Sequence, residues 1–467
     1  MVITKLNIDN EQNIDAGTSG LQGNHHFSFL IPHFSLIISH FLVDALCVCC
    51  LFQMAAQGGA VPLLGVFMLY NVLAFLTQPL TGMLADRVAR RQLLLVASVA
   101  LLSAAVLTAA VAAATTRGSV YQLSGIAMYA VATLLGMGNS LFHVWGGKQV
   151  AVATDNDMRA LGAFVSTGAF GLAVGVALHS WLLLIVLLAA LVATATVAIT
   201  TDTTAGGAAT TVRRTLSPAA VWGSVLLLMG VVMLRSLVGE VFSASIVRGA
   251  VAVTLLIGAV AMAGKMAGGW LARSMGIVPS MSIVVAAVVV CLLTQGMATA
   301  VPWIGLLTVN LTMAVTLYLA NIVMPRREGL AFGLLAAALM PGYLLAMYGT
   351  GGSWVVPQLL MALLPTIAVE AGVLWLMRER RADVLWASVV VNILTNVPLN
   401  IFLLSVGSTW PRIIVCEAVV IIVEALWYAY FTGSWRRGAV YSVLCNAISF
   451  LLGMLAQLCV MLFQTLY

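Results

Sequence analysis

Charged residues are scarce in this chain: Lys, Arg, Asp and Glu make up 8% of its 467 residues. A soluble domain of average composition carries roughly 25% charged residues, so this chain has too little charge to build a water-facing surface of its size. The composition therefore excludes a soluble enzyme, a nucleic-acid-binding protein and a disordered regulator.

Motifs for ATP use and metal-dependent hydrolysis are missing as well. The sequence contains no GxxxxGK[ST] loop for ATP phosphates and no HExxH pair for catalytic zinc. We therefore expect a protein that is not an enzyme and has no cofactor and no metal site. No basic segment precedes a short apolar stretch with a cleavage site, so we expect no removable signal peptide.

Cysteines offer no framework either, because all seven lie inside apolar stretches: Cys47, Cys49, Cys50, Cys291, Cys416, Cys445 and Cys459. Cys47 and Cys50 have the CxxC spacing, but no second pair completes a metal site. We expect small residues packed among apolar neighbours and no disulfides.

Apolar runs are what the chain has in abundance, with 62% hydrophobic residues and a mean hydropathy of +1.09. A helix that crosses a bilayer needs about 20 mostly apolar residues. We predict an all-α polytopic membrane protein with spans near 33–56, 60–84, 92–115, 120–143, 160–179, 181–200, 219–241, 246–268, 278–299, 302–323, 329–349, 354–377, 384–406, 412–432 and 438–464.

Basic residues are distributed unevenly over the loops between these spans. With a cytoplasmic amino terminus, the inner side holds Arg87, Arg90, Arg91, Lys148, Arg159, Arg213, Arg214, Arg273, Arg326, Arg327, Arg378, Arg380, Arg381, Arg436 and Arg437. The outer side holds little beyond Arg117, Arg248 and Arg412. This asymmetry predicts an inner or plasma membrane protein with its amino terminus in the cytoplasm.

An internal repeat divides the first twelve spans into two halves of six. Gly82-Met-Leu-Ala-Asp-Arg87 ends the second span, and Gly269-Trp-Leu-Ala-Arg273 ends the eighth. The predicted organisation is a flexible cytoplasmic tail (1–26), a first half (27–200), a cytoplasmic linker (201–217), a second half (218–378) and an accessory three-helix unit (383–467). Two related halves predict a central cavity and alternating access by rocking.

Several segments resemble a known transporter family. GMLADRVARR at 82–91 resembles the signature loop of the major facilitator superfamily. Four further segments resemble its fosmidomycin-resistance branch of drug exporters, namely His40–Asp44, Gly136–His143, Ser166–Gly171 and Leu234–Gly239. The resemblance covers about 33–377. It implies a bundle of six plus six helices, to which about three carboxyl-terminal helices are added.

Asp44 is the first candidate site residue, because it falls near the middle of the first span. An ionised side chain at the bilayer centre costs about 2.5–3.5 kcal/mol on insertion scales. His40 lies one helical turn earlier on the same face. We predict that these two residues carry the coupled proton; the alternative is a hydrogen bond that only packs helices.

Arg235 is the predicted substrate residue, because a guanidinium fork suits phosphate or carboxylate. The alternative is an ion pair of Glu240 with Arg235 or Arg248 at the outer gate. His143 and Lys148 end the fourth predicted span and would form an inner vestibule or a membrane anchor. The predicted substrate-binding residues are Arg235, Glu240, His143, Asn139 and Gln78.

Gating is predicted at the second helix end and in the eleventh span. Asp86 and Arg87 would bond a neighbouring helix terminus and release it as the halves rock. Gly82 would permit close backbone approach, and Arg273 takes the equivalent place in the second half. Pro341 removes a backbone donor and predicts a kink. The alternatives are a plain cytoplasmic turn and an inert kink.

Polar residues also recur in the carboxyl-terminal addition. Asn392, Asn396 and Asn400 share one helix face, and Glu417 and Glu424 share another. Glu417 and Glu424 would relay protons or bind a cation, or would simply bond helices together, which is the reading we favour.

The predicted function is a proton-coupled antiporter that exports small anionic or amphipathic compounds. Its expected partners are that substrate, protons and the lipid bilayer, with no nucleic acid. One alternative is a proton-coupled uptake symporter for a sugar or organic acid. Another is a transport-inactive scaffold or sensor that binds a partner or a second copy through 383–467.

Overall fold

The computed structural model describes residues 34–57, 63–88, 92–115, 121–200, 216–247, 249–348 and 355–466. All regular elements in these ranges are helices. The predicted tail (1–26) and most of the predicted linker (201–217) lie outside them.

The first six predicted spans correspond to helices in the structure. They are α2 (Phe34–Gln57), α3 (Leu63–Asn71) continued by the π-helical turn η2 (Val72–Leu76) and α4 (Gln78–Arg87), α5 (Gln92–Thr115), α6 (Tyr121–Ala153), α7 (Met158–Ala177) and α8 (Trp181–Thr200). The second span is interrupted at Thr77, two residues before Pro79. Proline has no backbone N–H to donate, so the regular helical hydrogen bonds cannot continue through it.

The later spans follow the same pattern. They are α9 (Pro218–Ala244), α10 (Val251–Met275), α11 (Ile277–Leu293), α12 (Val301–Asn310) with α13 (Met313–Val323), α14 (Glu328–Ala337) with α15 (Leu339–Tyr348), α16 (Val355–Leu376), α17 (Ala382–Val406), α18 (Trp410–Thr432) and α19 (Trp435–Leu466). α14 ends at Ala337 and α15 begins at Leu339. Pro341 has no backbone N–H, so it cannot donate the helical hydrogen bond to the Ala337 carbonyl.

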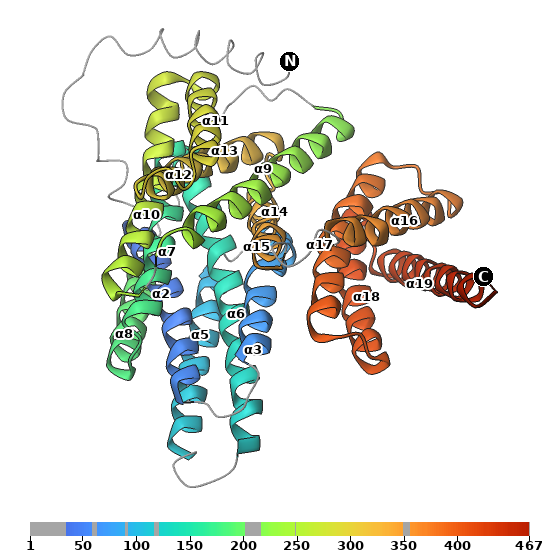
Figure 1. Cartoon of the computed structure of the whole chain (residues 1–467), viewed down its shortest axis with the longest axis horizontal. Coiled ribbons are helices and arrows are strands. Elements are labelled where there is room, and N and C mark those ends of the chain that lie inside the picture. Colours follow the sequence, from blue (N-terminus) through green and yellow to red (C-terminus); the bar gives the residue numbers. More distant parts are fainter. Residues whose placement is uncertain are drawn as a thin grey trace. The chain divides into compact units, whose positions relative to one another are not determined.

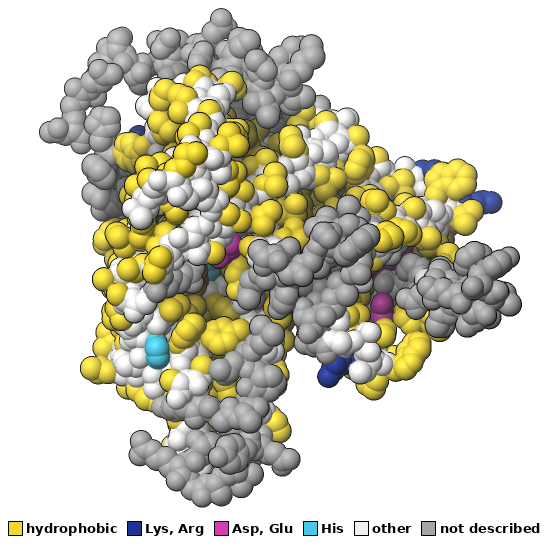
Figure 2. All heavy atoms as spheres, in the orientation of Figure 1, with side chains coloured by type: hydrophobic (Ala, Val, Ile, Leu, Met, Phe, Trp, Pro, Cys, Tyr) yellow, Lys and Arg dark blue, Asp and Glu magenta, His cyan; other side chains and the backbone are white. Residues whose placement is uncertain are grey.

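Thirteen of the described helices are long and apolar enough to cross a bilayer. The other two predicted spans coincide with shorter apolar helices, Ile277–Leu293 and Met361–Leu376. Yellow apolar side chains cover most of the coloured surface in Figure 2, and Lys, Arg, Asp and Glu are few on it. The predicted all-α polytopic fold is confirmed, and the chain is an integral membrane protein.

One boundary differs in a way that matters for the site. The fourth span was expected to end at 143, but α6 continues to Ala153. The extra turns are protein-covered: Val144, Trp145 and Val150 are buried. Protein side chains and not lipid cover the glycines of this segment; Phe164, for example, lies against Gly146. His143 therefore lies well inside a helix and not at its end.

The helices group into two compact units, one of Met1–Val212 with Val231–Met340 and one of Arg213–Gly230 with Pro341–Tyr467. In the first unit α7 packs against both α2 and α10 (Figure 1), and α4 packs against α14. Helices of both predicted halves thus touch within this unit. The boundaries of the five predicted segments remain predictions.

Small residues make the crossing of α7 and α10 close. A Cβ on Gly258 would lie 2.3 Å from the Cβ of Ala173, and one on Gly269 would lie 2.3 Å from the Met158 carbonyl oxygen. Such contacts let backbones approach, which is how helices associate in lipid.

The second unit contains two matching helical hairpins, α16–α17 and α18–α19. Ile367-Ala-Val-Glu-Ala371 in α16 and Ile421-Ile-Val-Glu-Ala425 in α18 lie 54 residues apart. The same offset relates Ser388, Asn392 and Thr395 of α17 to Ser442, Asn446 and Ser449 of α19. This second repeat was not predicted from the sequence.

The matching residues bond to each other reciprocally. Asn392 Nδ2 donates to Glu370 within its own hairpin at 2.7 Å, and Asn446 Nδ2 donates to Glu424 within the other. Across the hairpins, Thr395 Oγ1 donates to Glu424 at 3.1 Å and Ser449 Oγ to Glu370 at 3.4 Å. Both carboxyl groups are buried. Glu424 therefore bonds helices of the two hairpins together, and the choice between bonding and proton relay for Glu417 and Glu424 stays a prediction.

The six cysteines whose side chains the structure describes are free. Five are buried and Cys416 is partly buried. Cys459 falls in a part of α19 whose side chains lie outside the description.

Candidate functional site

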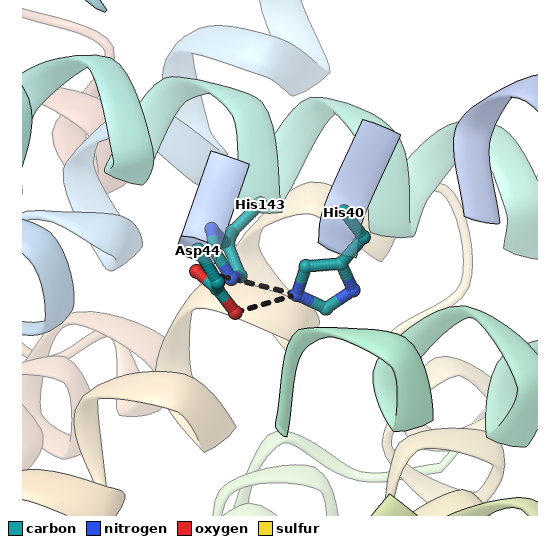
Figure 3. A group of neighbouring side chains, drawn as sticks. All are labelled: His40, Asp44 and His143. Carbon is teal, nitrogen blue, oxygen red and sulfur yellow. Dashed lines mark hydrogen bonds and ion pairs between the residues drawn. The ribbon is translucent and has the colours of Figure 1, made fainter. Parts of the chain in front are cut away.

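Three ionisable side chains meet inside the first unit: His40 and Asp44 of α2 and His143 of α6 (Figure 3). The two His Nε2 atoms lie 2.8 Å apart. Asp44 Oδ2 lies 3.4 Å from His40 Nε2, and Asp44 Oδ1 lies 3.3 Å from His143 Nε2. His40 is 4% exposed and Asp44 6%, so the cluster is shielded from bulk water. We call it the triad.

The other nitrogen of each histidine fixes how the rings carry protons. His40 Nδ1 lies 2.6 Å from the Phe164 carbonyl oxygen, and His143 Nδ1 lies 3.0 Å from the Asn139 carbonyl oxygen. A carbonyl only accepts, so both Nδ1 atoms carry hydrogen. If both rings were neutral, two Nε2 lone pairs would face each other at 2.8 Å. One further proton between them turns this repulsion into a hydrogen bond, and the Asp44 carboxylate balances its charge.

Neighbouring groups hold the triad in place. Asn139 Nδ2 donates to Asp44 Oδ1 at 3.0 Å, and the ring of Phe164 stacks on His40 with centroids 4.5 Å apart. Gly168 of α7 leaves the room that the acid needs, because a Cβ there would lie 2.3 Å from Asp44 Oδ2 and 2.6 Å from His40 Nε2.

The triad also offers a ligand set that suits a metal. One atom from each of its three residues lies within 4.8 Å of the others, and two histidines with one carboxylate bind divalent transition metals in many proteins. Lys265 interacts electrostatically with both His143 and Asp44, and its positive charge opposes a divalent cation. The arrangement therefore suits a single proton better than a metal ion.

Arg235 of α9 is buried, with 7% exposure, and donates from Nη1 to Thr316 Oγ1 of α13 at 3.3 Å. Within the described part of the chain it forms no ion pair with Glu240, which lies partly buried later on α9. Its partner is thus a hydroxyl group on another helix, and the role of Arg235 in binding substrate stays a prediction.

Lys265 is the site residue that the sequence interpretation missed. The eighth span was expected at 246–268, and Lys265 inside it was not singled out. In the structure α10 continues to Met275, so Lys265 lies inside the helix. It interacts electrostatically with Arg235 and with Asp44. A lysine inside a predicted span was the available signal.

The remaining predicted substrate residues have different surroundings. Asn139 is part of the triad's support, and His143 belongs to the triad itself. Gln78 is buried in α4, where its Nε2 donates to the Ala74 carbonyl and not to the triad. Its Oε1 has no hydrogen-bond partner among the described atoms.

A second polar contact joins the two predicted halves at the end of α4, and we call it the latch. Asp86 accepts from the backbone N–H of Gly329 and Leu330, both at 2.9 Å, and so caps the first turn of α14. Lys148 of α6 forms an ion pair with Asp86 at 3.0 Å and donates to the Ala85 carbonyl. A cavity of about 260 Å³ lies beside this contact.

Gly82 makes the latch possible by close approach. A Cβ on Gly82 would lie 2.3 Å from the Gly329 carbonyl oxygen, so the backbones of α4 and α14 nearly touch. Arg87 is at the end of the same helix, also beside the cavity. Gly82 and Asp86 contact a helix of the other predicted half, as expected for residues that gate. The role of Gly82, Asp86 and Arg87 in gating stays a prediction.

Arg273 lies at the exposed end of α10, close enough to act on Asp157 before α7. Asp157 caps α7 and binds Arg159 at 2.6 Å. Burial alone would raise the pKa of Asp157, but the hydrogen bonds and charge of Arg159, with the charge of Arg273, lower it below its usual value. This loop acid thus stays ionised opposite the second half.

Replacing Asp86 with asparagine should open the latch. The asparagine amide has no charge to pair with Lys148, and it caps α14 less well. The loss of these interactions costs about 1–3 kcal/mol and shifts the conformational equilibrium about 10-fold or more. Spin labels at Val88 and Arg326, in a background without native cysteines, should report longer distances. Asp155→Asn removes an exposed charge from the loop after α6 and should change nothing. Unaltered distances in Asp86→Asn would rule out the latch.

Comparison with known proteins identifies the fold. No protein-family profile and no curated protein sequence matches the chain. Among solved structures, the E. coli fucose:proton symporter FucP matches with a TM-score of 0.50 and 12% identity, covering 79% of this chain and 98% of its own. A bacterial homologue of the iron transporter ferroportin, outward-facing, has 14% identity and a TM-score of 0.44, covering 90% of this chain and 98% of its own. By its similarity to the symporter, the chain has the fold of a transporter of the major facilitator type.

Proposed function

We propose that this protein is a proton-coupled secondary transporter and that the triad is its coupling site. The observation that carries the proposal is the 2.8 Å separation of the two Nε2 atoms, each in a ring whose Nδ1 already donates. A shared proton would stabilise this geometry. The proton sits in a buried place where its loss would leave two lone pairs in contact.

Protonation of the triad would act on the packing of the first unit. His40 and Asp44 lie on α2, His143 on α6, and the carbonyl that holds His40 on α7. A change of one charge among three helices changes the relative stability of two conformations of the bundle. The latch between α4 and α14 is the contact that would break as the two halves rock.

Two directions of transport are candidates. The sequence predicts export of small anionic or amphipathic compounds in exchange for protons, in the manner of a drug efflux antiporter of the cytoplasmic membrane with its amino terminus inside. The alternative is uptake of an organic acid together with protons. Arg235, buried and bonded only to Thr316 among the described residues, supports an anionic substrate in either case.

The test is proton movement in proteoliposomes that contain the full chain and a pH-sensitive dye in the lumen. Sugars, organic acids, phosphorylated metabolites and amphipathic drugs are added one at a time. We expect at least one compound to start a proton flux. Its sign relative to the substrate flux, followed with radiolabelled compound, separates antiport from symport.

Two histidine variants control this experiment. His143→Gln removes a proton-binding ring of the triad and should abolish the flux. His179→Gln alters a histidine at the end of α7, where Nδ1 contacts the Val176 carbonyl, and should leave the flux intact. Substrate flux without proton flux in the unaltered protein would refute proton coupling. Neither flux with any compound, from protein shown to be folded, would favour the scaffold or sensor.

A further inference from the structure

Two cations are held inside the first unit with no acid bonded to either. Arg235 is 7% exposed and has Thr316 Oγ1 as its hydrogen-bond partner within the described residues. Lys265 is partly buried and, within the same residues, has neither a hydrogen bond nor an ion pair. The two interact electrostatically with each other. Their helices, α9 and α10, belong to the same predicted half.

Such an arrangement is costly without a counter-charge. A charge placed inside a membrane protein normally pairs with an opposite charge or lines a path for charged cargo. Two like charges that also repel each other raise the cost further. Asp44 is the acid that interacts with Lys265, but its two oxygens already lie within 3.4 Å of the triad histidines. A negative group is thus missing from the Arg235–Lys265 pair.

We infer that Arg235 and Lys265 together bind an oxyanion head group of the substrate that carries two negative charges, such as a sulfate-like or dicarboxylate group. The inference rests on the proposed function and names the substrate class of its site. Arg235 supplies a planar fork that fits two oxygens, and Lys265 supplies a point charge. Thr316 orients the fork, because its Oγ1 accepts from Nη1 and its own hydrogen goes to the Met313 carbonyl.

The same charges decide how the anion and the proton influence each other. Lys265 acts on His143 and on Asp44, so the anion site and the triad share one electrostatic environment. The charged groups that interact there are Arg235, Lys265, His40, Asp44 and His143. A bound dianion lowers the positive potential at the triad and thereby favours its proton. By reciprocity the proton strengthens anion binding, and ligands that bind together are carried together. The pair therefore favours symport over antiport.

The experiment uses the purified full chain in detergent and inorganic sulfate and succinate as probes, with chloride at equal ionic strength as the blank. Binding is followed as the rise in unfolding temperature with probe concentration. We expect saturable stabilisation by at least one dianion and none by chloride. Sulfate keeps its charge across neutral pH, and its affinity should increase at lower pH, because a protonated triad favours the dianion. Asp44→Asn should remove this pH dependence.

Charge variants separate a binding role from a structural one. Lys265→Gln should weaken dianion binding by at least about 10-fold and should raise the unfolding temperature without ligand, because an unpaired charge is removed. Lys265→Arg should restore binding. Arg436→Gln removes an exposed charge from the start of α19 and should alter neither quantity.

Three results would overturn the inference. The first is a lower unfolding temperature of ligand-free Lys265→Gln, which would mean that Lys265 has a structural partner. The second is dianion binding that Lys265→Gln leaves unchanged. The third is the absence of dianion binding in a protein that moves substrate in proteoliposomes. Dianion binding lost in Lys265→Gln, in a protein with substrate flux but no proton flux, would leave this site standing and refute the coupling proposal alone.

Discussion

Replacing Asp44 with asparagine is expected to lower substrate-dependent proton flux at least about 100-fold. In the proposed coupling site the carboxylate balances the proton shared by His40 and His143, and removing one member of a buried charge cluster costs about 3–5 kcal/mol. Without that charge the histidine pair no longer holds its proton. The measurement is dye-reported proton flux in proteoliposomes with a compound that the unaltered protein transports.

The same variant should keep exchange of labelled for unlabelled substrate, because exchange needs no net proton movement. Asp155→Asn, an exposed acid after α6, is the matched control and should behave as the unaltered protein. Proton flux in Asp44→Asn within about threefold of the unaltered protein would place the coupling site elsewhere, since a factor of three is below about 1 kcal/mol. Loss of both exchange and flux would call for a folding assay on the variant.

Gly168→Ala is expected to disturb the triad through one methyl group. Its Cβ would lie 2.3 Å from Asp44 Oδ2 and 2.6 Å from His40 Nε2, and both of these atoms are bonded within the cluster. Overpacking of this kind costs about 1–3 kcal/mol. We expect a lower unfolding temperature in detergent and a loss of proton flux of about 10-fold or more.

Gly223→Ala provides the control, because a Cβ at Gly223 of α9 meets nothing within 4 Å. Alanine there should leave proton flux unchanged and should stabilise the helix by up to about 1 kcal/mol. If Gly168→Ala behaved like Gly223→Ala, the packing of α7 against the triad would be looser than the structure shows.

The spans were predictable from sequence because hydropathy responds to lipid exposure, and most faces of these helices are apolar. Span ends were harder, since α6 and α10 continue beyond their apolar windows. The segment after His143 is covered by protein and not by lipid, so its glycines and Lys148 do not end the helix. His143, which was placed at a helix end in this way, belongs to the site, and Lys265 was not predicted as a site residue.

Local spacing in the sequence predicted part of the site. The rest depends on contacts between residues far apart in the chain, which only the structure shows. His40 and Asp44 are four residues apart on one helix, so their proximity follows from helix geometry. The cap that Asp86 forms with Gly329 bridges 243 residues. A sequence without related sequences carries no signal for such a pair, although it does show that Asp86 ends a helix and suits a helix terminus.

The matched hairpins of the second unit bear on the descent of the chain. Each carboxyl group bonds once within its own hairpin and once to the other, so exchanging the two hairpins leaves the pattern unchanged. This is the pattern of an isologous contact between two copies of one surface. Duplication and fusion of a two-helix unit that paired with a second copy of itself would leave this symmetry. We predict that a chain encoding α18–α19 ahead of α16–α17 rebuilds the same four bonds.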